Sequence, residues 1–290
     1  MSDYLAKPDP DDPKLTRTVA GIDHAGAAVS VPVVEERTLT LFLNAQEIVT
    51  LMTIGDHPAE LAVGYLLNQN MIASAAEVSA VDVDVDLGVV VVRTAHETDF
   101  EAKTRKKIRT SGCAMGTMFG DVMERFEEIR LPNAEVRTSW LYALTKTINT
   151  TPSLYLKAGA IHGSVLCQRD RALLYMEDVG RHNAVDKVAG YMALHGLSGD
   201  DKIFYTTGRL TSEMVIKTVL MGIPILISRS GFTASGVELA TRANLTLIGR
   251  ARGRRFTALA GIERIVFDIA PDEAAEEPPG LRRKAAGDDW

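Results

Sequence analysis

The sequence predicts an α/β protein with two parts, and two patterns along the chain lead to this fold class. Between residues 201 and 249, apolar strand-like runs alternate with helix-like stretches in the order strand, helix, strand, helix, strand. This alternation is typical of a parallel sheet with right-handed crossovers. Residues 38–93 instead contain two hairpin patterns around one helical pattern, which predicts a smaller α+β unit ahead of the main sheet.

The composition is sufficient for two domains, because the chain has 290 residues and is 46% hydrophobic. Prolines and charges fill both ends, so we expect disordered tails over residues 1–14 and 271–290. Between them we expect a small α+β domain over residues 15–100 and an α/β domain over residues 101–270.

The charge and the hydropathy exclude several classes of protein. A net charge of −6 argues against general nucleic-acid binding. The first residues lack the basic and apolar segments of a signal peptide, and no apolar run approaches the roughly 20 residues needed to span a bilayer. We therefore expect a soluble, cytoplasmic protein that binds neither membranes nor nucleic acid.

The elements of the smaller unit follow from local patterns. Residues 38–43 and 47–52 are mostly apolar and flank a three-residue turn, which predicts a hairpin. Pro58 then lies at the start of a predicted helix. Residues 81–86 alternate valine with aspartate and lead through a turn into residues 89–93, a second hairpin with one face in water. Nothing in this unit indicates chemistry.

A cysteine follows this unit, and the cations just before it are Arg105, Lys106, Lys107 and Arg109. Neighbouring cations favour the reactive thiolate over the thiol, so Cys113 is a candidate nucleophile. Gly112 and Gly116 on either side would let a bulky ligand approach the backbone. The alternative, a basic strand followed by an inert small residue, fits this stretch equally well. Cys167 ends an apolar strand pattern and is predicted to be a buried structural thiol.

The chain is organised around residues 177–187, which lie between a strand-like run and a helical pattern. Asp178, Arg181 and His182 crowd this strand-to-helix turn, and the free N–H groups of a helix N-terminus favour an anion. A capped helix would need only one or two polar side chains, so we predict a binding site that includes these three residues. His162 is a candidate neighbour, although a core histidine bonded to a backbone carbonyl is an equally good interpretation.

Further polar turns follow the strands predicted at residues 201–206, 225–227 and 245–249. The carboxyl ends of parallel strands meet at one edge of a sheet, so we expect these turns to lie together. Hydroxyl groups and guanidinium forks suit phosphate oxygens, which predicts a site for a phosphorylated small molecule. The residues predicted to bind it are Gly208, Arg209, Ser228, Arg229, Ser230, Arg250, Ala251, Arg252, Gly253, Arg254 and Arg255. An RNA-binding patch or a solvated loop is the alternative, but RNA readers usually interleave aromatic residues, and here only Phe256 is present.

Several of these segments resemble the FdhD/NarQ family of formate dehydrogenase accessory sulfurtransferases. The most specific is Glu-Asp-Val-Gly-Arg-His-Asn-Ala-Val-Asp-Lys at 177–187. Gly-Arg-Leu-Thr-Ser-Glu-Met-Val at 208–215 and Ile-Pro-Ile-Leu-Ile-Ser-Arg-Ser at 223–230 are also similar. So are the helical stretch at 60–67 and the Gly-Ala-Ile-His turn at 159–162. The likeness covers about residues 33–257.

The resemblance implies a cytidine-deaminase-like domain with a mixed or parallel sheet, a smaller N-terminal α+β domain, and a homodimer. It implies a protein that receives sulfur from a cysteine desulfurase and passes it to the molybdenum cofactor of the formate dehydrogenase catalytic subunit. That cofactor, bis-molybdopterin guanine dinucleotide, would be bound as cargo, with no metal held directly by the protein. By position, Cys113 would carry the persulfide and residues 250–255 would bind the cofactor.

One position departs from the family pattern. The family loop carries Cys-x-x-Cys, whereas here the second cysteine position is Gly116. A second thiol can relay a persulfide, and a zinc site of the deaminase type needs the same pair, so we expect no zinc. Two functions therefore stay open. One is a sulfurtransferase that works through Cys113, and the other is a non-catalytic chaperone that binds the mature cofactor and delivers it.

Overall fold

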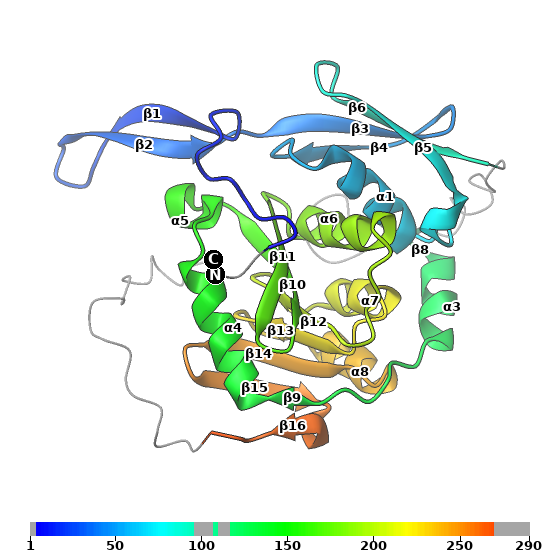
Figure 1. Ribbon diagram of the computed structural model, residues 1–290. Coiled ribbons are helices and arrows are strands. Elements are labelled where there is room, and N and C mark those ends of the chain that lie inside the picture. The colour runs from blue at the N-terminus through cyan, green and yellow to red at the C-terminus, as the bar shows by residue number, and fades with distance from the viewer. Residues whose placement is uncertain (1–3, 96–106, 110–116, 270–290) are drawn as a thin grey trace.

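A computed structural model of the chain describes residues 4–95, 107–109 and 117–269 (Figure 1). Its centre is a six-stranded sheet in the order β11-β10-β12-β13-β14-β15. The bounds of these strands are β10 His162–Gln168, β11 Arg171–Asp178, β12 Ile203–Thr206, β13 Ile225–Ser228, β14 Thr246–Arg252 and β15 Arg255–Ala260. The middle three are parallel, as predicted, and the β10–β11 and β14–β15 hairpins add antiparallel strands on both sides. The sheet is therefore mixed.

Helices cover both faces of this sheet. Side chains of α6 (Arg181–Leu194), α7 (Ser212–Leu220) and α8 (Ala234–Arg242) share one core cluster with Leu166, Phe204, Leu226 and Leu247 of the strands. The opposite face packs against α4 (Thr138–Thr150) (Figure 1). Because side chains alternate across a strand, neighbouring strand residues enter opposite clusters, which gives three layers.

The smaller N-terminal unit is a four-stranded sheet in the order β4-β3-β6-β5, together with α1 (Pro58–Asn68). Its strands are β3 Arg37–Leu43, β4 Gln46–Thr53, β5 Val78–Asp84 and β6 Val89–Thr94. Both predicted hairpins are confirmed. β3 and β6 pair in parallel, which joins the hairpins into one sheet. A separate two-stranded ribbon, β1 (Thr16–Ile22) with β2 (Ala28–Val34), extends away from the body (Figure 1).

Two helices join the smaller unit to the larger one. α1 and α6 cross with their backbones in contact, since a Cβ added at Gly64 would lie 1.8 Å from the carbonyl oxygen of Asp186. A Cβ added at Gly190 would lie 1.8 Å from the carbonyl oxygen of Glu60. The core cluster on this side contains residues of both units, including Leu41 and Leu66. The boundary that we predicted between residues 100 and 101 lies outside the described residues.

The expectation of a disordered tail over residues 1–14 is wrong for the part that the structure describes. The N–H of Leu5 donates to the carbonyl of Leu173 at 2.7 Å, and the N–H of Tyr175 donates to the carbonyl of Ala6 at 2.9 Å. These bonds form a parallel bridge alongside β11. An edge strand has unpaired backbone groups, which this segment satisfies in spite of its prolines.

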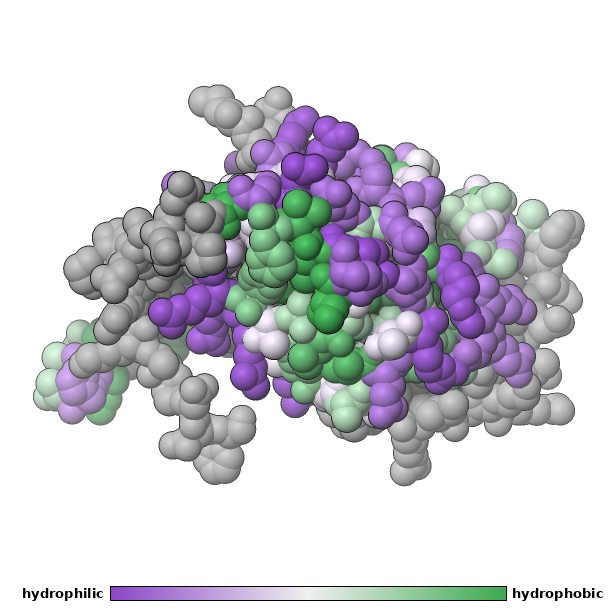
Figure 2. All heavy atoms as spheres, turned by 90° about the horizontal axis from the view of Figure 1, so that it is seen from below, coloured by the Kyte–Doolittle hydropathy of each residue, from purple (hydrophilic) through white to green (hydrophobic). Residues whose placement is uncertain are grey.

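Smaller elements complete the described chain. They are β7 Lys107–Arg109, β8 Thr117–Phe119, α3 Gly120–Glu128, β9 Val136–Arg137, α5 Leu154–Ala158, β16 Ile265–Val266 and the 3-10 turns Ala75–Glu77 and Ile262–Arg264. Figure 2 shows apolar side chains gathered on the lower face, where β15 and β16 lie in Figure 1. The large exposed apolar side chains of this end are Leu259, Ile262 and Phe267. Across the described residues, no helix is both long and apolar enough to cross a membrane.

Candidate functional site

The predicted polar turns lie along one edge of the six-stranded sheet. The parallel strands β12, β13 and β14 end at this edge, and the antiparallel strand β10 begins there. His162 pairs with Asp178 at the end of β11, and the N–H of Thr207 donates to the carbonyl of Gly163 at 2.9 Å. The turns after β11, β12, β13 and β14 are therefore neighbours, and the expectation that they share an edge is confirmed.

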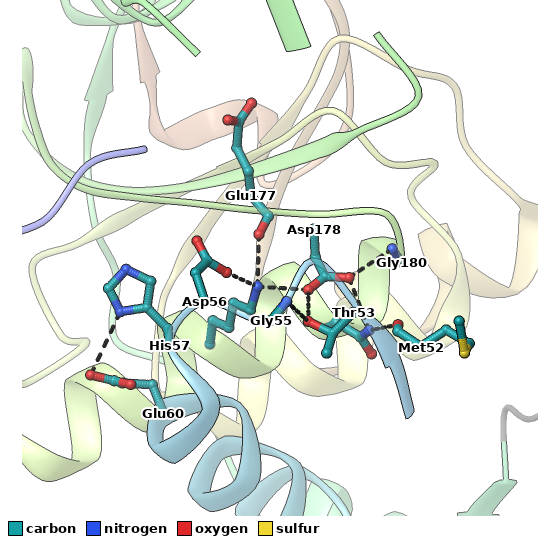
Figure 3. A network of polar contacts seen from close by, with 11 residues as sticks. Met52, Thr53, Gly55, Asp56, His57, Glu60, Glu177, Asp178 and Gly180 are labelled. Atoms are coloured by element: carbon teal, nitrogen blue, oxygen red, sulfur yellow. Dashed lines mark hydrogen bonds and ion pairs between the residues drawn. The ribbon is translucent and has the colours of Figure 1, made fainter. Parts of the chain in front are cut away.

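Asp178 anchors the turn between β11 and α6 (Figure 3). Its carboxylate has no exposure to solvent and accepts hydrogen bonds from Thr53 Oγ1 at 2.5 Å, Asn183 Nδ2 at 3.0 Å and the N–H of Gly180 at 3.1 Å. The same carboxylate pairs with Lys187 Nζ at 2.6 Å. All of these partners are internal, so Asp178 positions the turn. Its predicted contact with a ligand is not supported by this arrangement.

Lys187 ties the same turn to the start of α1. Its ammonium group is completely buried and donates to Asp56 Oδ1 at 2.5 Å and to the carbonyl of Glu177 at 2.9 Å. Burial lowers the pKa of Lys187, but the carboxylates of Asp178 and Asp56 outweigh burial and hold the pKa above its ordinary value. A charged lysine is stable here because two carboxylates surround it.

Glu177, the residue before Asp178, points toward the other layer. Its carboxylate accepts hydrogen bonds from the N–H groups of Leu154 at 2.8 Å and Tyr155 at 3.1 Å, at the first turn of α5. Burial raises the pKa of Glu177 to about 7, although both N–H groups favour the ionised form. Asp186 is likewise internal, since it pairs with Lys217 Nζ at 2.7 Å and accepts from Asn68 Nδ2 at 2.6 Å.

Arg181 differs from these anchored residues. It is 7% exposed, and its Nε and Nη2 atoms have no hydrogen-bond partner among the described residues. Its side chain lies against Gly208, where an added Cβ would be 3.2 Å from Arg181 Cδ and 3.3 Å from Arg181 Cβ. A buried guanidinium edge without partners is unusual, because unpaired buried polar groups are costly.

Two histidines lie beside Arg181. His182 Nε2 is 2.9 Å from Glu213 Oε2 on α7, and burial lowers the pKa of His182 in spite of that carboxylate. His162 Nδ1 is 3.3 Å from Thr207 Oγ1. Burial lowers the pKa of His162, and the charge of Arg181 lowers it further. His162 is therefore a neighbour of the turn, and its Nδ1 faces a side chain, not a backbone carbonyl.

The outer part of the edge carries the remaining arginines. Arg209, Arg250, Arg252, Arg254 and Arg255 are exposed, and Arg229 is half-buried. The guanidinium of Arg229 lies 5.3 Å from the centre of the Tyr155 ring, and that of Arg254 lies 5.9 Å from the Tyr142 ring. Such stacking holds a guanidinium in place.

Backbone contacts order this outer edge. Ser228 is completely buried, donates from Oγ to the carbonyl of Gly208 at 2.6 Å and accepts from the N–H of Ser230 at 2.9 Å. The N–H of Arg250 donates to the carbonyl of Ser230 at 2.8 Å, with Arg250 at a φ of 53°. Ala251 is completely buried. Ser228 and Ala251 therefore pack inside the edge, and the structure does not support direct ligand contacts by these two.

The structure tests the prediction for only one of the two cysteines. Cys113 and Gly116 lie outside the described residues, so their predicted place beside the turn stays a prediction. Cys167 is completely buried, and burial raises the pKa of its thiol, which confirms the prediction of an inert structural cysteine. Within the described part of the chain, no group of three or more His, Cys, Asp or Glu side chains is arranged to hold a metal.

Glu213 is a residue of this region that the sequence analysis did not assign to the site. Glu213 follows Thr211 and Ser212, so its position in the first turn of a predicted helix is explained by the helix dipole alone. The sequence does not show that Glu213 is buried, with 4% of its surface exposed. A carboxylate on the buried side of an apolar helix needs a partner, and that expectation could have pointed to a histidine such as His182.

Comparison with known proteins adds independent findings. The model of the FdhD/NarQ family matches residues 34–266. The chain is similar to the sulfur carrier protein FdhD of Bacillus subtilis (strain 168), with 31% identity that covers 80% of this chain and 89% of the relative. It is 30% identical to the sulfur carrier protein FdhD of Bacillus pumilus (strain SAFR-032), over 80% of this chain and 90% of the relative.

A solved structure has the same fold. The structure is similar to the crystal structure of a protein from Desulfotalea psychrophila, described as a putative formate dehydrogenase accessory protein, with a TM-score of 0.71 and 28% sequence identity. The match covers 87% of this chain and 99% of that protein. The two-part mixed α/β architecture is thus shared with this protein.

Proposed function

The chain belongs to the FdhD/NarQ family, and we propose that it is a sulfur carrier and an accessory protein for a formate dehydrogenase. Two of its relatives are named sulfur carrier proteins, and a structural neighbour is described as a putative formate dehydrogenase accessory protein. The cargo is the molybdenum cofactor in its bis-molybdopterin guanine dinucleotide form, and the donor of sulfur is a cysteine desulfurase. A homodimer is the expected working form.

The observation that carries the assignment of the cargo is the row of arginines at the carboxyl edge. Arg209, Arg229 and the exposed arginines of residues 250–255 belong to adjacent turns. Guanidinium groups bind phosphate oxygens through paired, charge-assisted hydrogen bonds. A guanine dinucleotide carries several phosphates, so one molecule can contact several of these arginines together. The donor set therefore fits a phosphate-rich cofactor.

Cys113 is the residue that accepts the sulfur in this proposal. Its thiolate attacks the outer sulfur of a persulfide on the desulfurase, and the S–S bond of that persulfide breaks. The desulfurase cysteine leaves as a thiolate, and the new S–S bond holds the sulfur on Cys113. The cations at Arg105, Lys106 and Arg109 favour the thiolate that this step needs.

A second function has a specific observation in its favour. Gly116 stands where the family pattern has a second cysteine, so no neighbouring thiol can release a persulfide from Cys113. In this alternative, the protein is a non-catalytic chaperone that binds the mature cofactor and delivers it to the dehydrogenase. Cargo binding by the arginine edge is common to both functions.

Sulfur loading distinguishes the two functions. We expect one sulfur atom on Cys113 after the full chain is incubated with a cysteine desulfurase and cysteine, measured by mass spectrometry of the intact protein and its peptides. C113A should remain unmodified, whereas C167A, which removes a buried and inert thiol, should load as the wild type does. A cofactor-bound protein without a sulfur adduct, together with active formate dehydrogenase in a C113A strain, would establish the chaperone.

A further inference from the structure

Arg181 is buried, unlike the exposed arginines of the outer edge. Arg181 lies at the first position of α6, and the residue before the helix, Gly180, provides no side-chain cap. The N–H groups of the first turn therefore have no side-chain cap, and the Nε and Nη2 atoms of Arg181 have no partner among the described residues. Both features attract an anion.

Residues at the neighbouring strand ends pack beside Arg181. Gly208 lies against Arg181, and a side chain at this position would press on Arg181 Cδ and on Thr206 Oγ1 at 3.2 and 3.4 Å. Ser164 pairs with Thr206 in the sheet, and its completely buried Oγ also has no hydrogen-bond partner among residues 4–95, 107–109 and 117–269. The strand partner of Thr206 therefore also carries an unpartnered hydroxyl.

Side chains of both charges lie near Arg181. Arg181 and Arg209 are cations, and both act to lower the pKa of His162. Glu213, the acidic side chain nearest to His182, is engaged by that histidine at 2.9 Å. Asp178, the other nearby acid, is neutralised by Lys187. The Nε and Nη2 atoms of Arg181 make no hydrogen bond to either of these acids.

We propose that Arg181 and the N-terminus of α6 together, which we call the Arg181 seat, bind one phosphoryl-type oxyanion through the Nε and Nη2 edge of the guanidinium. That edge presents two parallel N–H groups, which match two oxygens of a tetrahedral anion. The exposed arginines of residues 250–255 lie on other turns and bind other phosphates of the cargo. The inference rests on the proposed function for the identity of the cargo, but the seat itself follows from the burial of Arg181.

The seat can be tested without cofactor or partner enzymes. Inorganic phosphate should bind to the full chain, measured by calorimetry, and the R181Q variant should bind it at least about tenfold more weakly. R181K should also lose most of the affinity, because an ammonium group cannot present the paired N–H groups. The matched control is R171Q, an exposed arginine at the opposite edge of the sheet, which should keep the phosphate affinity within about twofold.

Further measurements exclude a folding defect as the cause of weak binding. They also show whether the bound anion is a nucleotide phosphoryl group or a free oxyanion. In the wild type, phosphate should shift the Nε resonance of Arg181 in ¹⁵N NMR, and G208A should weaken binding by displacing the Arg181 side chain. Competition of GDP with phosphate would indicate a nucleotide phosphoryl group, whereas binding of phosphate without competition would indicate a free oxyanion. Both results support the seat, and guanosine should not compete.

The seat would be disproved by wild-type protein that binds neither phosphate nor GDP at millimolar concentration, or by R181Q that binds phosphate as tightly as the wild type does. Either result would leave water as the partner of Arg181. Sulfur loading of Cys113 and formate dehydrogenase activity are separate readouts. Loss of phosphate binding in R181Q together with an unmodified Cys113 in the wild type would contradict sulfur transfer and support the seat.

Discussion

The carboxyl group of Glu177 is buried, and its two oxygens accept hydrogen bonds from N–H groups of α5. Burial raises the pKa of Glu177 to about 7. The unfolded chain releases the same proton near the ordinary value of 4.5. Between these two values the folded protein keeps its proton while the unfolded chain is ionised, so this residue lowers the free energy of unfolding as the pH rises. The loss is complete above the folded pKa and amounts to about 3 kcal/mol.

The E177Q variant removes this titration. We expect its free energy of unfolding, measured with urea and compared with that of the wild type, to improve by about 3 kcal/mol between pH ~5 and pH ~8. The variant starts lower at the acid end, because an amide can accept only one of the two N–H groups. E238Q, at an exposed site on α8, is the control and should show the same small difference at both pH values. A constant gap for E177Q would refute a shifted carboxyl.

At the scale of single residues, the sequence predicted that the polar turns meet at one edge of the sheet but not which of their side chains point inward. The polar turn at 177–187 was identified correctly, and Arg181 and His182 do lie at the edge of the sheet. Asp178 belongs to the same local pattern, yet its partner Thr53 lies 125 residues earlier in the chain, and Asp56, which shares Lys187 with it, lies 131 residues before that lysine. Local patterns cannot show such partners, so the inward and outward residues of the turn could not be told apart.

The crossing of α1 and α6 is the contact between elements that is most sensitive to side-chain size. Gly64 and Gly190 let the two backbones touch, and an alanine Cβ at either position would lie 1.8 Å from a carbonyl oxygen. We expect G64A and G190A each to lower the free energy of unfolding by more than about 3 kcal/mol, because the helices must move apart and disrupt the shared core. Chemical denaturation measures the change.

A glycine in open space provides the control for this crossing. Gly21 on β1 has nothing within 4 Å of an added Cβ. G21A should therefore change the free energy of unfolding by less than about 0.5 kcal/mol. Wild-type stability in G64A and G190A would mean that the two helices are not in backbone contact.

Most elements could be predicted from local patterns, whereas pairings between distant segments could not. The hairpins and the alternation of strands and helices after residue 200 follow from periodicity and turn residues. The parallel pairing of β3 with β6, and of Ala6 with Leu174 beside β11, depends on which strand edges remain open after folding. Periodicity carries no information about open strand edges, so the pattern of a proline-rich segment predicts a disordered tail even where the segment pairs with β11.

For the whole molecule, the net charge of −6 conceals a strongly basic edge. Arg250, Arg252, Arg254 and Arg255 are all exposed at one end of the β14–β15 hairpin, next to the turns that carry Arg209 and Arg229. This clustering could be predicted from sequence, because the carboxyl ends of parallel strands meet at one edge. A basic edge on an acidic protein attracts compact anions more selectively than a uniformly basic surface would.

This arrangement leads us to expect binding of guanine nucleotides at the edge. GDP should raise the melting temperature of the full chain by mass action, and added salt should reduce the shift, because the exposed arginines are screened. The double variant R252Q/R254Q should weaken GDP binding at least about 100-fold, since each charge-assisted hydrogen bond to phosphate contributes roughly 1.5–3 kcal/mol and each 1.4 kcal/mol changes the affinity about tenfold. Thermal melting and calorimetry provide the measurement, and the reactivity of Cys113 toward iodoacetamide should not change.

The control for this experiment is a double variant at the other end of the sheet that changes the net charge by the same amount. It distinguishes binding at the basic edge from an effect of net charge. Arg169 and Arg171 lie at the β10–β11 turn, at the edge opposite to the carboxyl ends of β12 and β13. R169Q/R171Q should keep the GDP affinity within about twofold, because screening leaves little effect over that separation. Equal losses of GDP affinity in both double variants would mean that GDP binding depends on net charge alone. If single-stranded RNA raises the melting temperature and GDP does not, the basic edge is a nucleic-acid-binding surface and not a cofactor site.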